Sequence, residues 1–332
     1  MMQSTKNKNN DDDERIRRIA AFFDFDKTLI ALDSAGKEAT TVLATKYDAY
    51  HHYPLLWTGL IVCTLLNPLV ERNYMQTETL NLIYYYCCYR NLSVNELQGH
   101  AQDLYLRLLK PAVYQEILNE MQEHQRKGHL VVLLSATSEH LIEPFAKEYK
   151  VDVCISTKII KKQTVHSKRK RTKGDNNNNN NDNDDSDDSD DDDDDDAQYY
   201  YTGVVDGKVC CQKTKSDHVH RLAQEYNLNL QKSFAYSDHH HDIPLLESVG
   251  NPSVVHPTSL LEQEAKKRDW PILRPIIPEI VIAMEEAKQK TKKTKDEEQD
   301  SSLPKTMILF GIGILGLGTV IVGLGLPLIR SQ

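Results

Sequence analysis

Two aspartates near the start of the chain have the types and spacing of a catalytic pair. Asp24 and Asp26 stand at the end of an apolar run that begins at Ile19, and Thr28 follows them. Side chains two residues apart in an extended chain point to the same side. Two carboxylates held so close are costly unless a cation lies beside them. The pair therefore indicates a site that uses a metal ion.

Two later segments supply a hydroxyl group and positive charge. Ser135 and Ala136 follow the apolar run 130–134 and lead into a predicted helix. A hydroxyl beside the free amides of a helix N-terminus suits a phosphate group. Lys213 and Lys215 lie in a separate segment and could balance the charge of such a ligand. These residue types indicate a phosphorylated ligand.

A fourth segment places carboxylates around a histidine run. Asp238 and Asp242 follow the short apolar run 233–236 and bracket the histidines at 239–241. Carboxylate oxygens suit a hard ion such as Mg²⁺. The histidines raise the possibility of zinc, but consecutive side chains at the start of a helix are not expected to face one ion. We therefore expect at most one histidine to act as a ligand.

A parallel sheet would bring these four segments together. Apolar runs typical of buried strands alternate with helical periodicity, which gives a parallel sheet with helices on both faces. Ligands bind such sheets at the carboxyl ends of the strands. The stretch 46–110 has no strand pattern and predicts a helical cap inserted into the α/β core. The predicted strands are 19–25, 130–134, 151–156, 233–236 and 253–255, and the predicted helices are 113–127, 139–149 and 213–226.

The same segments resemble the motifs of the haloacid dehalogenase (HAD) superfamily, and most closely its phosphoserine-phosphatase-like subfamily. FFDFDKT resembles the first motif, D-x-D-x-T, and LLSATSEHLIEP resembles the second. GKVCCQKTKSDHV resembles the lysine motif, and YSDHHHDIPLLESVGNPSVVHP resembles the last motif. The likeness covers residues 18–160 and 200–275. It implies a Rossmann-like parallel-sheet core with an inserted cap.

The resemblance also implies catalytic roles. Asp24 would be the nucleophile that forms an aspartyl phosphate, and Asp26 would be the general acid and then the base. Lys215 would balance charge, with Lys213 as the alternative. Gln212 stands where the family usually has glycine. The phosphate would be bound at Thr28, Ser135 and Ala136, and Mg²⁺ at Asp24, the backbone carbonyl of Asp26 and Asp238, with Asp242 in support.

The middle of the chain departs from this pattern. Residues 161–198 hold a basic stretch, an Asn run and an Asp run, and predict a disordered insertion. Of the 49 acidic residues, 13 are aspartates between 175 and 196. The rest of the chain is therefore mildly basic, although the net charge of the whole chain is −9. Because the aspartates neutralise the adjacent basic stretch, no nucleic acid partner is expected. The six cysteines include no C-x-x-C and favour a reducing compartment.

A long apolar segment predicts a membrane anchor. Residues 307–329 include no charged side chain, and about 20 apolar residues cross a bilayer. Lysines between 288 and 295 precede it and favour a cytosolic location for the catalytic part. The expected arrangement is a single-pass C-terminal anchor. A second apolar stretch, 54–70, is interrupted by Pro68 and is interpreted as a cap helix, with an interfacial membrane contact as the alternative.

These features predict the organisation and the function together. The expected function is a Mg²⁺-dependent phosphomonoester hydrolase, with phosphoserine as the first substrate candidate and a small phosphomonoester and the membrane as partners. Alternatives are a phosphatase of a lipid-derived or amino-alcohol phosphate, a phosphotransferase, and a non-catalytic membrane-tethered scaffold. The predicted segments are a disordered tail at 1–17, the core at 18–45 and 111–280, the cap at 46–110, the insertion at 161–198, a polar linker at 281–306 and the transmembrane helix at 307–329.

Overall fold

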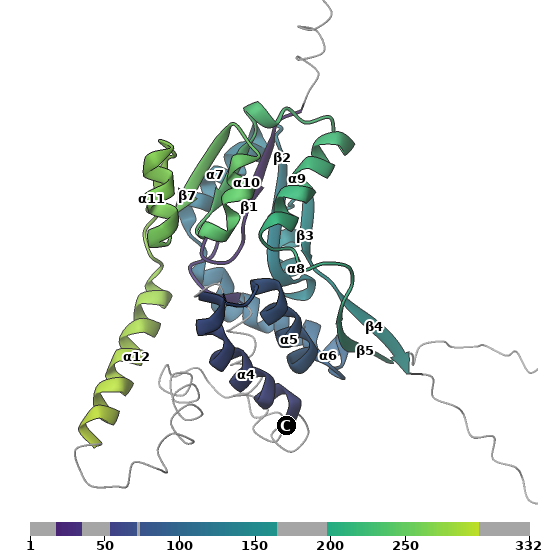
Figure 1. Cartoon of the computed structure of the whole chain (residues 1–332), viewed down its shortest axis with the longest axis vertical. Helices are drawn as coiled ribbons and strands as arrows, with labels where there is room; N and C mark the ends of the chain where they lie inside the picture. The colour runs from purple at the N-terminus through teal and green to yellow at the C-terminus, as the bar shows by residue number, and fades with distance from the viewer. Residues whose placement is uncertain (1–17, 35–53, 72–73, 165–197, 299–332) are drawn as a thin grey trace, which may run out of the picture.

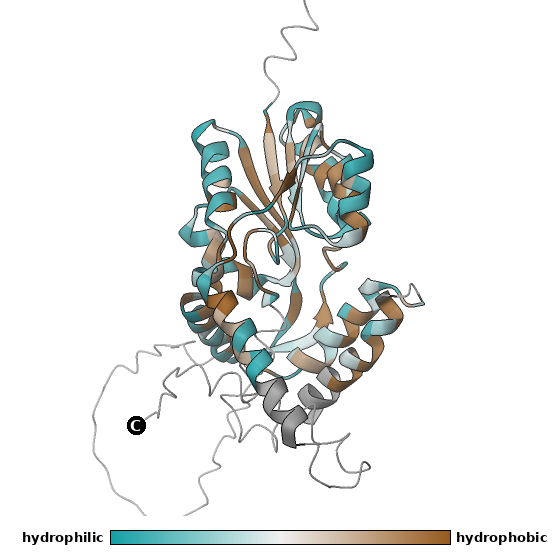
Figure 2. Ribbon diagram, turned by 90° about the vertical axis from the view of Figure 1, so that its left-hand side faces the viewer, coloured by the Kyte–Doolittle hydropathy of each residue, from teal (hydrophilic) through white to brown (hydrophobic). Residues whose placement is uncertain are grey.

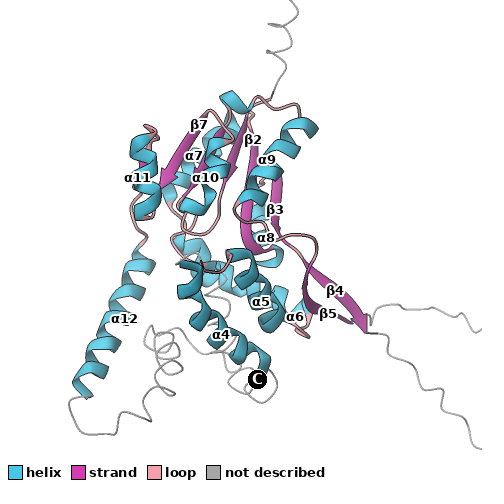
Figure 3. Cartoon of the chain, in the orientation of Figure 1, coloured by secondary structure: helices cyan, strands magenta, loops and turns pink. Residues whose placement is uncertain are grey.

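A parallel sheet of six strands forms the centre of the protein in a computed structural model, which describes residues 18–34, 54–71, 74–164 and 198–298 (Figures 1 and 3). The predicted tail and transmembrane segment, and most of the predicted insertion, lie outside the described residues. The strand order is β3-β2-β1-β6-β7-β8, and every neighbouring pair is parallel. The strands are β1 (Ala20–Phe23), β2 (Leu130–Ser138), β3 (Val153–Thr157), β6 (Phe234–Ser237), β7 (Asn251–Val255) and β8 (Ile272–Leu273).

The sheet is buried on both faces, as its apolar strands require. All four residues of β1 are fully buried. Ala21 and Phe23 belong to one hydrophobic cluster, and Ala20 and Phe22 belong to the other, because side chains alternate between the faces of a strand. Figure 2 shows the hydrophobic strands at the centre and hydrophilic residues on the outer sides of the flanking helices.

Helices cover the two faces in separate groups. The first cluster includes residues of α7 (Gln115–Arg126), α8 (Glu139–Glu148) and α12 (Glu279–Glu298). The second includes residues of α9 (Lys213–Glu225), α10 (Ile243–Glu247) and α11 (Ser259–Lys267). This arrangement confirms the predicted α/β class with a parallel-sheet core. Short 3-10 turns at Leu230–Lys232 and His240–Asp242 complete this part.

The cap consists of helices, as predicted, and lies below the sheet in Figure 1. Its helices are α4 (Pro54–Glu71), α5 (Thr77–Tyr89) and α6 (Val94–Leu104). A π-helical turn at Tyr105–Leu109 and a 3-10 turn at Lys110–Ala112 lead back to the core. Within the described part of the chain, no helix combines the length and the apolar character needed to cross a membrane.

An antiparallel ribbon stands where the sequence predicts the start of the insertion. Strand β4 (Ile159–Thr164) pairs with β5 (Gln198–Val205), so residues 161–164 and Gln198 are strand and not disordered. Tyr201 and Val205 of β5 join a third hydrophobic cluster with the cap. Gly203 lies between them with φ +78°, and an added Cβ would meet the backbone oxygen of Tyr86 at 2.9 Å. The ribbon therefore packs closely on α5.

The predicted polar linker is also partly wrong. The segment from residue 281 is helical as far as Glu298. Val281 and Met284 are 5% exposed and pack into the first cluster, while Lys288 and later residues are polar. The two apolar residues are too few to outweigh the lysine-rich composition that follows, so the sequence pattern alone predicts a linker.

Candidate active site

A cavity of about 230 Å³ lies between the carboxyl ends of the sheet strands and the cap. Asp24 directly follows β1, Ser135 lies in β2, and Asp238 directly follows β6. Phe23 is in register with Leu133 and Tyr236, so the three strands present these groups at one level. The predicted residues that line the cavity are Asp24, Asp26, Ser135, Ala136, Lys215, Asp238 and Asp242.

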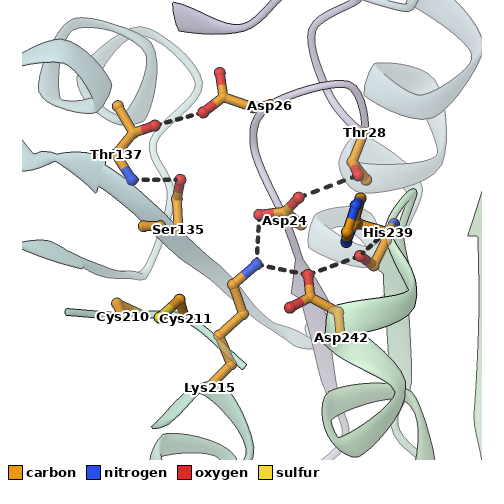
Figure 4. Close-up of polar contacts among 12 residues, drawn as sticks. Asp24, Asp26, Thr28, Ser135, Thr137, Cys210, Cys211, Lys215, His239 and Asp242 are labelled. Carbon is orange, nitrogen blue, oxygen red and sulfur yellow. Dashed lines mark hydrogen bonds and ion pairs between the residues drawn. The ribbon is translucent and has the colours of Figure 1, made fainter. Parts of the chain in front are cut away.

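Lys215 is the centre of the charged network in this cavity. Its Nζ donates to Oδ1 of Asp24 at 2.7 Å and to Oδ2 of Asp242 at 2.7 Å (Figure 4). The residue is 4% exposed, whereas Lys213 is exposed, which favours Lys215 over the alternative. Burial alone lowers the pKa of a lysine, but the attraction of Asp24 and Asp242 outweighs it and holds the pKa of Lys215 above its ordinary range. The lysine is therefore charged.

Asp24 is buried and held from two sides. Burial raises its pKa, and the neighbouring ammonium of Lys215 acts against that rise. The hydroxyl of Thr28 donates to Oδ2 of Asp24 at 3.4 Å. Thr28 is fully buried and is absent from the cavity lining, so it contacts the carboxylate and not the space where the sequence predicts a phosphate. Its position favours a role in orienting Asp24.

Asp26 lies at the edge of the same cavity with a different set of partners. Its Oδ2 accepts a hydrogen bond from the hydroxyl of Thr137, and its Oδ1 accepts the backbone N–H of Ser34 at 2.7 Å. The Thr137 N–H in turn donates to Oγ of Ser135 at 3.1 Å. Burial, with repulsion from Asp33, raises the pKa of Asp26 to about 7. A carboxyl group of this pKa can give and take a proton near neutral pH.

Asp238 and Asp242 supply the carboxylates of the last motif. Asp242 accepts from Lys215 and from the Ser237 hydroxyl at 2.8 Å. Asp238 is 6% exposed, and its carboxylate has no hydrogen bond or ion pair with any described residue. Burial is the main reason that the pKa of Asp238 rises to about 8, and repulsion from the nearby charge of Asp24 adds to the rise. Asp24 and Asp242 thus share one lysine while Asp238 lies buried nearby, and carboxylate oxygens in such surroundings fit a divalent cation.

The cap contributes residues that the sequence did not identify as part of the site. Thr77 and Asn81 lie one turn apart on α5 and line the cavity, as does Asp33 of the core. Nε2 of Gln212 donates to Oγ1 of Thr77 at 3.2 Å and joins the core to the cap. Gln212 has φ 48° and ψ −125°, a backbone conformation that favours glycine. This explains why glycine suits the position.

The histidine run forms a compact group of rings. His239 and His241 both line the cavity. The ring centroids of His239, His240 and His241 lie 4.3–4.4 Å from one another. The rings lie close together because the chain enters a 3-10 turn at His240 while His239 is still extended, and the expectation that at most one histidine acts as a ligand stays a prediction. The three rings therefore converge.

Comparisons with known proteins agree with the fold and with a hydrolase. The sequence model of the family described as haloacid dehalogenase-like hydrolase matches residues 21–182. The "Inhibition of morphological differentiation protein" of Streptomyces azureus is 26% identical over 77% of this chain and 78% of its own length. A protein of Mycobacterium tuberculosis named as a probable phosphatase is 25% identical over 77% of this chain and 75% of its own. The chain is thus similar to haloacid dehalogenase-like hydrolases, and its relatives support a phosphoric monoester hydrolase.

The similar proteins also include phosphoserine phosphatases. A Mycobacterium tuberculosis protein named as phosphoserine phosphatase is 22% identical over 76% of this chain and 70% of its own. The fold is shared with a Bordetella pertussis protein of unknown function, at a TM-score of 0.56 and 21% identity over 77% of this chain and 98% of the other. A probable phosphoserine phosphatase from Vibrio cholerae shares it at a TM-score of 0.50 and 13% identity, covering 79% and 63% of the two chains.

Proposed function

We propose that the protein is a Mg²⁺-dependent phosphatase that acts through a phosphorylated Asp24. The observation that carries the proposal is the single cavity in which Asp24, Asp26 and Lys215 meet. An Asp24 carboxylate oxygen attacks phosphorus as the bond from phosphorus to the leaving alcohol oxygen breaks. Asp26 gives its proton to that oxygen. Asp26 then takes a proton from water, whose oxygen attacks phosphorus and releases inorganic phosphate and free Asp24.

The residues around Asp24 fit a Mg²⁺ ion. Asp24, the main-chain carbonyl of Asp26 and Asp238 would hold it, and Asp242 would support the set through Lys215. When bound, the ion would offset the charge of the transferring phosphoryl group. Lys215 favours the ionised form of Asp24 and positions it in a buried setting, and Thr28 fixes its second oxygen. Ser135 and Ala136 would bind phosphoryl oxygens from the β2 side.

The substrate we propose is a small polar phosphomonoester, with phosphoserine as the first candidate. The cavity is small, and Asp33, Thr77 and Asn81 give it polar groups for a charged or hydroxylated substrate. A lipid-derived or amino-alcohol phosphate is the second candidate, favoured by the exposed apolar side chains of the cap helix α4. These are Ile61, Val62, Leu65 and Leu69.

The test is turnover of a generic aryl phosphate by the full chain and its Asp24→Asn variant. The variant should lose turnover while its thermal unfolding remains cooperative, and chelation of divalent ions should stop the unaltered enzyme. Turnover unchanged by Asp24→Asn would support a scaffold instead. A panel that includes phosphoserine and lipid phosphates then separates the two substrate classes.

We also propose that the apolar segment 307–329 holds the enzyme at a membrane with the catalytic part on the cytosolic side. The uncharged sequence of that segment and the lysines before it support this location. Removal of residues 307–332 should release the protein from vesicles in a flotation assay and leave Mg²⁺-dependent turnover intact. Continued flotation would implicate α4, and Leu65→Asp, at a position 70% exposed, would test that helix directly.

A further inference from the structure

The three consecutive histidines form the most concentrated group of nitrogen ligands in the described part of the chain. One ligand atom from each of His239, His240 and His241 lies within 4.8 Å of the other two. Two nitrogens bound to one zinc ion at its usual bond length of about 2.0–2.1 Å are roughly 3.3 Å apart. Small side-chain rotations on this partly exposed turn would shorten the distances between the histidine nitrogens from within 4.8 Å to about 3.3 Å. The geometry is therefore within reach of a shared ion.

The hydrogen bonding of the cluster leaves coordination capacity unused. Nδ1 of His240 and Oγ1 of Thr258 are both buried, and neither atom has a hydrogen-bond partner. The segment of Thr258 is joined to the start of the histidine turn, because the Thr258 N–H donates to the Asp238 carbonyl at 2.9 Å. Buried polar atoms without partners are rare in folded proteins and call for an explanation. A bound cation at the histidines would satisfy the imidazole.

One existing contact competes with metal binding. Nδ1 of His239 accepts the main-chain N–H of His241 at 3.2 Å. This is a long hydrogen bond, and a ring rotation exchanges it for a coordinate bond. The remaining nitrogens of His240 and His241 are not committed to hydrogen bonds with described residues. The competition therefore concerns one ring of three.

We propose that His239, His240 and His241 bind a borderline transition cation of the Zn²⁺ type. Imidazole nitrogen is a preferred ligand for zinc, copper and nickel, whereas the neighbouring aspartates offer the oxygen ligands that Mg²⁺ requires. The site is thus chemically separate from the Mg²⁺ site, although His239 and His241 line the same cavity. Because the histidines lie between Asp238 and Asp242, an ion there would constrain both carboxylates and inhibit turnover.

The test is calorimetric titration of the full chain with zinc in saturating Mg²⁺. The unaltered protein should bind one equivalent, and the paired change His240→Ala and His241→Ala should weaken that binding at least tenfold. His220→Gln is the matched control, because His220 is exposed on α9, away from the turn, and should leave zinc affinity unchanged. Cys211→Ser controls for a thiol ligand, since Cys211 also lines the cavity.

A spectroscopic measurement keeps the proposal falsifiable if the paired variant fails to fold. Electron paramagnetic resonance of the unaltered protein with one equivalent of Cu²⁺ should show hyperfine coupling to two or three imidazole nitrogens. Absence of nitrogen coupling would overturn the site. Zinc binding that survives the change of His240 and His241 to alanine would also overturn the site. The same holds for zinc binding that is lost only in Cys211→Ser.

Discussion

Replacement of Lys215 by methionine should damage both stability and turnover, for one electrostatic reason. The side chain of Lys215 is 5% exposed and holds Asp24 and Asp242 at 2.7 Å each. Removing one partner of a buried ion pair costs about 3–5 kcal/mol, because the remaining charge is left without compensation. Methionine keeps most of the volume, so this figure reflects charge and not a cavity. Loss of a preorganised positive group should also lower kcat about 10²–10³-fold.

The assay pairs urea unfolding with aryl phosphate turnover, using Lys213→Met as the matched control. Lys213 is in the same turn of α9 but is exposed, so its replacement should change stability by less than about 0.5 kcal/mol and leave kcat within twofold. Both variants remove one positive charge and differ only in burial and ion pairing.

The pH dependence gives a second check on the same reasoning. Without the ammonium, the folded-state pKa of Asp24 rises further above that in the unfolded chain. Folding of the variant then takes up protons, so its stability deficit shrinks as the pH falls from about 7.5 to 5. Equal effects of the two lysine substitutions, or a deficit that grows in acid, would refute the assignment of Lys215 as the charge-balancing residue.

Three further perturbations test the fold around the site. Gly250→Ala should destabilise the protein by about 1–3 kcal/mol in urea unfolding, since an added Cβ would lie 1.9 Å from the Gln231 carbonyl oxygen. Gly99→Ala should not destabilise it, because an added Cβ there meets nothing within 4 Å. A larger loss of stability in Gly99→Ala than in Gly250→Ala would contradict this packing. Burial lowers the pKa of His124 to about 4, so the folded protein resists a proton that the unfolded chain accepts. Between pH 6.5 and 4 this should remove about 2–3 kcal/mol from the free energy of unfolding, and His124→Gln should not show that loss. Identical dependence of the unfolding free energy on pH in the two proteins would disprove this. Excision of residues 167–197 should leave kcat within a few-fold, and an inactive product would show that this segment contributes to the site.

The grouping of the candidate site residues could be predicted from the sequence because most of them follow short apolar runs. In a parallel sheet the ends of such runs meet at one edge, so Asp24, Ser135 and Asp238 had to lie close together. The preference for Lys215 over Lys213 agrees with their burial, since only the former reaches two carboxylates. These predictions rest on local apolar patterns and on the rule that parallel strands place their carboxyl ends at one edge of a sheet.

The remaining features depend on contacts between distant segments. The hydroxyl of Thr137 reaches Asp26 because the pairing of β2 and β3 is irregular between Leu134 and Ser138. The histidines gather because a 3-10 turn follows His239. The cap residues Thr77 and Asn81 face the site only through the docking of α5. No composition or spacing rule distinguishes such residues from ordinary polar ones, so they become visible only in three dimensions.

The ribbon of β4 and β5 also determines how the protein tolerates change in its repetitive sequence. Thr164 pairs with Gln198, so the two ends of the segment 165–197 are fixed at adjacent positions. The entropic cost of closing a loop between fixed ends grows only with the logarithm of its length. Replication errors that lengthen or shorten the Asn and Asp codon tracts between these ends would therefore leave the catalytic architecture in place. Individuals or strains that differ in tract length could carry equally competent enzymes.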